Sequence, residues 1–383
     1  MYKKRSCVMR SICIILCAAA TACADGSGSP PEAVVVSLTT EIPAGAEVFR
    51  CRYAVLPDQP LDVERFSHRY TAGSHHILLY PTSLSPVEAA AFGEDFDCTT
   101  SGDLGQVGLA YGASDEPTGE QRFPDGIGMR FAAQQVVLLE AHYLNATDAP
   151  ITATVEISLF PAQRPIETLA GNLFFYNYAI LVPPAPARAA ASMRCVLPDE
   201  VSLQFASSHM HRRGTHYRAD LVVPSGARQV LHETDDWESA EPAAFDPALI
   251  VPAGSAVEFT CDYVNDVPTV VTEGESAERD EMCMFIASYW PARDPSVGAC
   301  LAPGSAPLFG GSESCSAVLA CLDGTGETDA IAMQTCLART CPSSAATIHE
   351  FLNCLETSGC ESEGCIAERC GAQYLACENA TCT

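Results

Sequence analysis

Five histidines lie in short β-like segments, at spacings that could bring their imidazole side chains to one metal ion. His209 and His211 are two residues apart in SHMHRR, so on a strand both side chains leave the same face and could supply two imidazoles to one ion. The pair would equally suit the polar solvent face of a half-buried strand. His75 and His76 are adjacent in GSHHILLY and reach one ion only if the strand kinks or different ring nitrogens ligate. His142 ends the apolar run VVLLEAHYLN, where a partly buried, hydrogen-bonded histidine is the alternative to a ligand.

Met282, in Arg279-Asp280-Glu281-Met282-Cys283, adds a softer donor. A thioether favours Cu(I) and is of little use to Zn or Mg, so the methionine would narrow the choice of metal. Beside a disulfide cysteine, core packing is its other interpretation. Of the four remaining histidines, we expect His68, His232 and His349 to be surface residues, and Arg213-Gly214-Thr215 suggests a turn beside His216.

The elements that must position these residues are short strands. From about residue 35 to 300, apolar runs with period-two stretches alternate with Gly, Pro and Asp, which indicates antiparallel sandwiches rather than parallel α/β units. Pro86–Phe92 predicts a short helix in which Ser85 caps and Glu88 completes a capping box. The clearest predicted strands are Val34–Leu38, Gln134–Glu140, Thr152–Phe160, Tyr217–Val223 and Val257–Tyr263.

The pattern predicts a mainly β protein with two β-sandwich domains and a small disulfide-rich helical C-terminal segment. The Pro-containing stretch Pro161–Thr168 is the expected boundary between the sandwiches. The predicted parts are a signal peptide (1–22), a tether (23–34), an N-terminal sandwich (35–165), a C-terminal sandwich (166–301) and a Cys-rich helical tail (312–383).

The first segment predicts export. A basic start and a short apolar run precede Ala20-Thr21-Ala22-Cys23, which is similar to a bacterial lipobox with Cys23 as the lipidation site. Ordinary cleavage near Ala22 is the alternative. No later stretch reaches the roughly 18 apolar residues of a spanning helix. We therefore expect a lipoprotein of the bacterial cell envelope, periplasmic or on the outer membrane or cell surface, held only by its N-terminal lipid, or otherwise a secreted protein.

Cysteine usage agrees with an oxidising compartment. Beyond the signal peptide and Cys23, six cysteines are spread over the β region and ten are packed into the tail. Both sets are even, and a zinc site would need thiolates that an exported protein rarely keeps reduced. We expect disulfides, with short tail helices that the disulfides hold together.

Charge excludes several functions. The chain has 21 Lys+Arg against 48 Asp+Glu, a net charge of -27, so a nucleic-acid partner is not expected. Lys3 and Lys4 are the only lysines and lie in the signal segment, which excludes a catalytic lysine, a Schiff base or a P-loop in the mature protein.

The order of the motifs, HH, then LLEAHY, then HMH, then DEMC, resembles the copper type II, ascorbate-dependent monooxygenases, the family of dopamine beta-hydroxylase and the peptidylglycine alpha-hydroxylating enzyme. The surroundings His75–Tyr80, Phe123–Gly128 and Leu138–Asn145 are similar too. The resemblance covers roughly residues 40–300, and neither the signal peptide nor the tail.

The resemblance implies two coppers per chain, in two jelly-roll-like sandwiches that face one another across a solvent cleft. The first copper would relay electrons from ascorbate or an equivalent small reductant, and the second would be the catalytic centre where dioxygen and a small organic substrate meet. The implied ligands are His75, His76 and His142 for the first copper, and His209, His211 and Met282 for the second. The implied disulfides are Cys51 with Cys98, Cys195 with Cys300, and Cys261 with Cys283.

We do not expect a peptide substrate of the kind that the peptide-specific enzyme of the family amidates. The Arg, Asn and Tyr that clamp a peptide carboxylate in the peptide-specific enzyme are matched here by Ser207, Met284 and Ile286, which suggests a less polar substrate. Two alternatives to a monooxygenase stay open. One is a non-catalytic surface protein that binds or stores copper, and the other is an adhesion or scaffold protein without chemistry.

Overall fold

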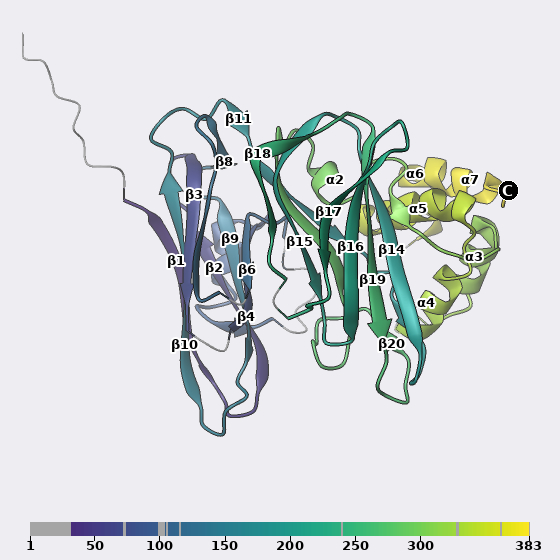
Figure 1. The fold of residues 1–383 in the computed structure, drawn as a ribbon, viewed down its shortest axis with the longest axis horizontal. Coiled ribbons are helices and arrows are strands. Elements are labelled where there is room, and N and C mark those ends of the chain that lie inside the picture. Colours follow the sequence, from purple (N-terminus) through teal and green to yellow (C-terminus); the bar gives the residue numbers. More distant parts are fainter. Residues whose placement is uncertain are drawn as a thin grey trace, which may run out of the picture. The chain divides into compact units, whose positions relative to one another are not determined.

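The structure, a computed structural model, describes residues 32–71, 74–98, 104, 106–114, 116–238, 240–326, 329–360 and 362–382. The predicted signal peptide, the lipidation site at Cys23 and most of the tether lie outside the described residues. Strands dominate, and most of the helices gather near the C-terminal end (Figure 1). Within the described ranges, no helix is both long and apolar enough to cross a membrane.

Residues 34–169 form two sheets, here called the first sheet pair. Their strands are β1 (Val34–Ile42), β2 (Glu47–Val55), β3 (Leu61–Tyr70), β4 (Ser74–Pro81), β5 (Phe96–Asp97), β6 (Tyr111–Ser114), β7 (Thr118–Arg122), β8 (Ile127–Phe131), β9 (Val136–Leu144), β10 (Ile151–Pro161) and β11 (Thr168–Leu169). One sheet has the order β1-β10-β3-β8-β11 with β7 beside β3, and the other has the order β5-β2-β9-β4-β6. Alternate residues of both sheets, such as Val155 on β10 and Ala141 on β9, fill one shared core.

Residues 171–307 supply the second sheet pair. Its strands are β12 (Gly171–Tyr176), β13 (Leu181–Val182), β14 (Arg188–Leu197), β15 (Val201–Met210), β16 (Gly214–Val222), β17 (Arg228–Thr234), β18 (Ala243–Val251), β19 (Ser255–Val264), β20 (Val271–Thr272), β21 (Cys283–Trp290) and β22 (Ala306–Pro307). The sheets β12-β21-β15-β18 and β17-β16-β19-β14-β22 enclose a second core, and β13 pairs with β20 alone. All five predicted strands are present, with shifted ends: β1, β10 and β19 extend beyond the predicted bounds, β9 begins after Gln134 and Gln135 and continues past Glu140, and β16 begins before Tyr217 and ends before Val223.

The predicted helix is confirmed as α1 (Pro86–Ala90), two residues shorter than expected. The Ser85 hydroxyl accepts the Glu88 N–H, and the Glu88 carboxylate accepts the Ser85 N–H, so both bonds of the capping box form. Three disulfides brace the sheets, and they join the same pairs that the resemblance implies: Cys51–Cys98, Cys195–Cys300 and Cys261–Cys283.

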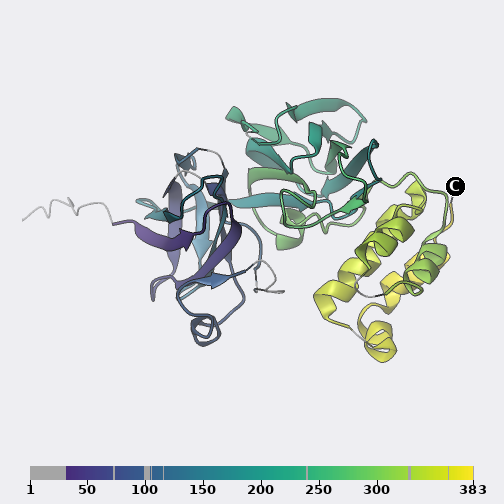
Figure 2. The same ribbon diagram turned by 90° about the horizontal axis from the view of Figure 1, so that it is seen from below.

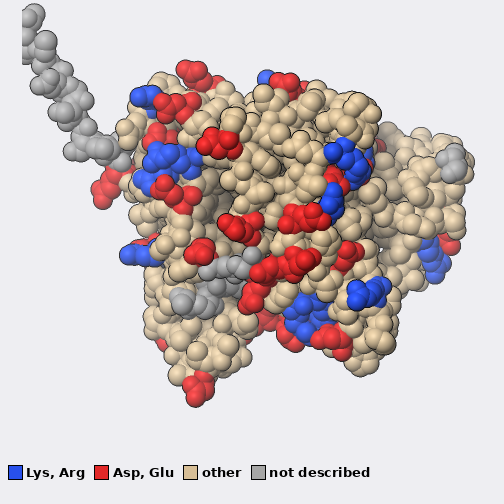
Figure 3. Space-filling model, in the orientation of Figure 1, with Lys and Arg blue, Asp and Glu red and all other residues tan. Residues whose placement is uncertain are grey.

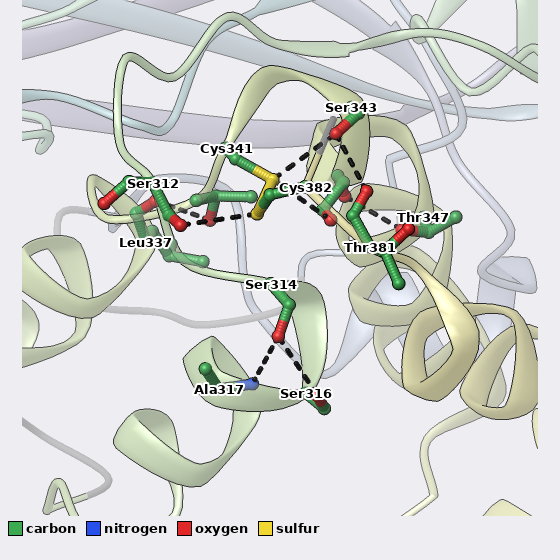
Figure 4. Close-up of a disulfide and its surroundings, with 12 residues drawn as sticks. Ser312, Ser314, Ser316, Ala317, Leu337, Cys341, Ser343, Thr347, Thr381 and Cys382 are labelled. Atoms are coloured by element: carbon green, nitrogen blue, oxygen red, sulfur yellow. Dashed lines mark hydrogen bonds between the residues drawn. A yellow bond between two sulfur atoms is a disulfide. The ribbon is translucent and has the colours of Figure 1, made fainter.

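The C-terminal tail is a cross-linked group of short helices (yellow in Figure 2). After α2 (Pro295–Gly298) in the second sheet pair come α3 (Cys315–Leu322), α4 (Ala330–Leu337), η1 (Pro342–Ser344), α5 (Ala345–Ser358), α6 (Glu363–Arg369) and α7 (Gly371–Asn379). All ten tail cysteines pair with one another: Cys315–Cys377, Cys321–Cys336, Cys341–Cys382, Cys354–Cys370 and Cys360–Cys365. Near the Cys341–Cys382 bond, the Ser343 hydroxyl donates to the Thr381 carbonyl, and Ser314 caps α3 (Figure 4).

The tail packs non-covalently on the second sheet pair. The Tyr178 hydroxyl and His349 Nδ1 are 2.8 Å apart, and the Gln334 side chain donates to the Tyr178 carbonyl. Tyr178 also packs against the small apolar core of the tail. The tail therefore covers the part of the second sheet pair around Tyr178.

The expectation that His68, His232 and His349 lie at the surface is wrong. They are 8%, 5% and 3% exposed. Each ring has a polar partner in the fold: Tyr111 and the Glu116 carbonyl for His68, Ser208 for His232, and Tyr178 for His349. A neutral imidazole can donate one hydrogen bond and accept another, so it can be buried without a charge. Such partners come from distant strands and are not visible in the sequence around each histidine.

Glu281 fixes the turn that follows β15. Its side chain is buried, and its carboxylate accepts the N–H of His211 (3.2 Å) and of Arg213 (2.8 Å). The buried Arg213 guanidinium lies 3.6 Å from the same carboxylate. Because Glu281 directly precedes Met282, these contacts hold the turn against the segment that enters β21.

The burial of His349 predicts a loss of stability in acid. Burial lowers the pKa of His349 below its usual 6.5, so below that pH the unfolded chain takes up a proton that the folded chain does not. Stability is therefore lost as the pH falls from 6.5 toward the folded pKa, with a slope of at most about 1.4 kcal/mol per pH unit for one proton. Urea unfolding from pH 7 to 5 should show a shallower slope for His349→Gln. Identical slopes for the parent chain and His349→Gln would contradict the prediction.

Glu281→Ala should destabilise the protein by about 2–5 kcal/mol, because two backbone N–H groups lose their acceptor. The buried Arg213 also loses one of its two carboxylate contacts and keeps the one with Asp266. The matched control is Glu278→Ala, which removes an exposed carboxylate 3.1 Å from Arg212 and should cost less than about 1 kcal/mol. Urea unfolding at pH 7.5 measures both. Equal losses would show that the Glu281 contacts contribute no more than a surface ion pair.

Candidate metal centres

The first set of histidines lies on neighbouring strands of one sheet. His76 on β4 is paired with His142 on β9, and their ring centroids are 4.9 Å apart. Phe49 is on β2, the other neighbour of β9, and its ring stacks on the His142 ring with the centroids 3.9 Å apart. Cross-strand partners project from the same face, so the sheet itself brings these two imidazoles together.

His75 falls at an irregularity of β4. The pairing of β4 with β9 shifts register between Ser74 and His76, which places an additional residue in the strand at this point. A bulge of this kind re-aims side chains and supplies the kink that adjacent histidines would need to share an ion. The side chain of His75 lies outside what the structure describes, so its ligation stays a prediction.

Glu47 orients His142. The Glu47 carboxylate lies 3.1 Å from His142 Nε2, and this hydrogen bond is the largest of the causes that lower the pKa of Glu47 to about 2. An ionised carboxylate can only accept, so Nε2 carries the proton and Nδ1 is the ring nitrogen suited to a metal. A ligand histidine held by a carboxylate in this way is common in metal sites.

The second set lies where β15 meets β21. His209 is on β15 and His211 directly follows that strand, with ring centroids 5.3 Å apart. Met210 and Cys283 are the last pair of the ladder, and His211 and Met282 are the next residues of the two segments beyond it. Continuing the alternation of faces by one residue predicts both imidazoles and the thioether on one side of the sheet.

The second set is held more firmly than the first. The backbone carbonyl of Asp280 accepts from His211 Nδ1 at 3.2 Å, which leaves the metal-binding role to Nε2. The Tyr263 hydroxyl donates to the Met282 carbonyl at 2.8 Å, and the Cys261–Cys283 disulfide anchors the next residue. Met282 itself is only 5% exposed.

The two sets adjoin, although the resemblance implies a solvent cleft between them. The ring centroids of His76 and His209 are 5.5 Å apart, so four imidazoles form a continuous series from His142 through His76 and His209 to His211. Hydrogen bonds from Ser276 and Ala277 of the second sheet pair to Glu47 of the first accompany this contact. At this point the described imidazoles are in contact and no cleft separates them.

Carboxylates dominate the electrostatics around the histidines. Glu140 Oε1 lies 3.8 Å from His76 Nε2, and burial, reinforced by the charge of Glu275, raises the pKa of Glu140 to about 8. Burial also raises the pKa of Glu281 to about 7, against the lowering effect of Arg213 and the His211 N–H. Acidic side chains are also more widespread than Lys and Arg on the molecular face drawn in Figure 3. Because a raised pKa leaves a carboxyl group largely protonated near neutral pH, Glu140 adds little negative charge beside His76 in the metal-free chain.

The donor set fits copper in its chemistry. Imidazoles accept copper in either oxidation state, and a thioether beside two imidazoles favours Cu(I). Among the described residues, the one group of three His, Cys, Asp or Glu side chains with ligand atoms within 4.8 Å of one another is Cys51, Cys98 and Glu140. Those cysteines form a disulfide and offer no thiolate, so that group is not a metal site. The two predicted copper sites are not groups of this kind, because one includes His75, whose side chain is not described, and the other includes a methionine.

The positions that match the peptide clamp lie beside the second set. Ser207 pairs with Ile286 and His209 pairs with Met284, so all four residues are on the face that carries the ligands. The sequence analysis predicted that these residues lie near the second site. It did not predict that Glu47 orients His142 or that the Glu281 carboxylate accepts the N–H groups of His211 and Arg213. Glu281 could have been suspected from its place beside Met282, whereas nothing around Glu47 marks it.

No curated protein matches this chain. The chain is weakly similar to three solved structures: the major capsid protein P2 from bacteriophage PM2 (8% identity, 66% of this chain, 97% of that chain, TM-score 0.29), an archaeal virus protein with a triple jelly roll fold (9%, 66%, 58%, 0.20) and PNGF-II (5%, 67%, 59%, 0.22). TM-scores this low support no conclusion about fold or function.

The second sheet pair gives a more specific match. Residues 172–309 match the family described as copper type II ascorbate-dependent monooxygenase, C-terminal domain. The matched segment contains His209, His211 and Met282 and ends before the helical tail. It indicates copper- and ascorbate-dependent monooxygenase chemistry for this part of the chain.

Proposed function

We propose that the chain is a copper-dependent monooxygenase of the type II, ascorbate-dependent family. It hydroxylates a C–H bond of a small organic substrate with dioxygen and two one-electron equivalents from ascorbate or a similar reductant. The observation that carries the proposal is the series of four adjoining imidazoles with Met282 in register beside it. The family match over 172–309 supports it independently.

The two sets of ligands have different tasks in this proposal. His75, His76 and His142 hold the copper that receives electrons, because three imidazoles accommodate both oxidation states. His209, His211 and Met282 hold the catalytic copper, because a thioether stabilises the reduced ion. When bound, copper supplies the redox chemistry by which one atom of dioxygen enters the product as hydroxyl and the other leaves as water, with two electrons and two protons consumed.

Contacts within the metal-free chain orient the ligand side chains of both proposed sites. Glu47 and the Asp280 carbonyl select the protonated nitrogen of His142 and His211, so the opposite nitrogen faces the metal. The Glu281 clamp and the Cys261–Cys283 disulfide limit the movement of Met282. Rigid ligands reduce the rearrangement that a change of oxidation state would otherwise require.

The surroundings of the second site favour a substrate with an apolar part. Met284 and Ile286 stand where a peptide-binding relative has polar groups, and Phe174 pairs with Ile286 on the same face. Peptide amidation is therefore not the proposed reaction.

Location and architecture complete the proposal. The eight disulfides within the described part of the chain fit an exported protein. We place the mature chain in the bacterial cell envelope, with lipid on Cys23, two jelly-roll-like domains at 35–165 and 166–301, and the tail at 312–383.

Copper analysis and isotope labelling test the function. The protein lacking residues 1–23 should bind two coppers per chain, both visible as type 2 Cu(II) signals by spin quantitation. With ascorbate and a panel of small substrates, it should transfer one atom of labelled dioxygen into a product. Bound copper without substrate-dependent consumption of ascorbate would instead support copper storage, and no bound copper would overturn both functions.

Met282→Ile should separate the two copper sites. The Cu(II) signal of the first site should persist, while the Cu(I) affinity of the second site and turnover should fall by roughly two orders of magnitude, because the soft donor is lost. Met284→Ile is the matched control for metal binding, since Met284 lies two residues further along on the same face. Competition with a Cu(I) chelator measures the affinity, and unchanged turnover in Met282→Ile would remove Met282 from the mechanism.

A further inference from the structure

Glu47, the first residue of β2, is in contact with both sheet pairs. Its Oε1 lies 3.1 Å from His142 Nε2 and accepts the N–H of Ala277 at 3.2 Å, while its Oε2 accepts the Ser276 hydroxyl at 3.1 Å. His142 belongs to the first sheet pair, and Ser276 and Ala277 belong to the second. One carboxylate therefore joins the first set of histidines to the segment that leads to Met282.

The segment that Glu47 binds is itself well ordered by hydrogen bonds. Asp280 N–H donates to the Ser276 carbonyl at 2.8 Å, and Ser276 N–H donates to the Asp280 carboxylate at 3.1 Å. Ser276 is 4% exposed and Ala277 is 9% exposed. Asp280 and Glu281 then contact His211, so the turn is continuous with the second set of ligands.

The Glu47 charge is balanced by these hydrogen bonds. Among the described residues, its one ion-pair contact is with His142, and no arginine is paired with it. Hydrogen bonds to an ionised carboxylate are roughly twice as strong as those between neutral groups. His142 of the first sheet pair and Ser276 and Ala277 of the second therefore share one strong hydrogen-bond acceptor. A metal on Nδ1 of His142 would make its Nε2–H a stronger hydrogen-bond donor to Glu47. The hydrogen bonds that Glu47 accepts from Ser276 and Ala277 would then change in strength.

We propose that Glu47 is a positioning residue that couples the first set of histidines to the 274–281 segment beside Met282. It holds the two sheet pairs together at this point and transmits occupancy of the first site to the second. By reciprocity, a change at the second site alters the first by the same free energy. The coupling rests on the proposed copper function, but the bridge exists in the metal-free chain and can be tested there.

The first arm of the test uses the metal-free full chain and hydrogen exchange read by mass spectrometry. Glu47→Ala should accelerate exchange in the 274–281 segment, at the Ala277 amide by about tenfold, because that N–H loses its acceptor. Glu47→Gln keeps the shape and one acceptor oxygen and should give an intermediate rate. The matched control is Glu41→Ala, which removes a carboxylate of the same sheet pair that is bonded to Thr152, and it should leave the segment unchanged. Unchanged exchange in Glu47→Ala would overturn the bridge.

The second arm adds Cu(II) to a chain carrying His209→Ala and His211→Ala, so that only the first site can be filled. Cu(II) should change the exchange of the 274–281 segment when Glu47 is present and should have no such effect with Glu47→Ala. The same change with and without Glu47 would overturn the coupling, since a merely structural role predicts no dependence on metal. If Cu(II) does not bind the first site at all, the copper function fails while the metal-free comparison still decides the bridge.

Discussion

The antiparallel pairing of β15 with β21 is the constraint on which the second site depends. It pairs His209 with Met284 and ends at Met210 and Cys283, the residues that adjoin His211 and Met282 in the sequence. A slip of one residue would turn these side chains into the core and bring core residues to the surface. The register is secured by three independent contacts: the Cys261–Cys283 bond, the Tyr263 hydroxyl on the Met282 carbonyl, and the Glu281 carboxylate on the turn after β15. The fold thus specifies the geometry of the ligands before any metal binds.

The first site is built on a different principle. His76 and His142 are also cross-strand partners, but a shift of register at His75 interrupts the ladder beside them. No disulfide lies next to either histidine in sequence, and Glu47 with the stacked Phe49 takes over the orienting role. The first site is therefore oriented by a hydrogen bond and stacking alone, whereas the second is also braced by a covalent cross-link.

The sequence was informative wherever local patterns decide structure. Period-two alternation located the strands, and Ser85 with Glu88 located α1. It was misleading wherever a residue depends on distant partners, as for the buried His349, whose hydroxyl partner Tyr178 is 171 residues away. The contact of His76 with His209 and the bridging role of Glu47 also arise from the packing of the two sheet pairs. No spacing or motif in one segment encodes such contacts, because they depend on surfaces that come together only in the folded chain.

The covalent closure of the tail has a consequence for how such a chain can change in evolution. Every disulfide of residues 312–383 stays within that segment, and every disulfide of the sheets stays within the sheets. Recombination near residue 311 could therefore add or delete the tail without leaving an unpaired cysteine on either side. The non-covalent contact through Tyr178 and His349 would be the part that such an exchange must refit. The segment thus has the covalent properties of a transferable module, because its disulfides need no cysteine from the domain to which it is joined.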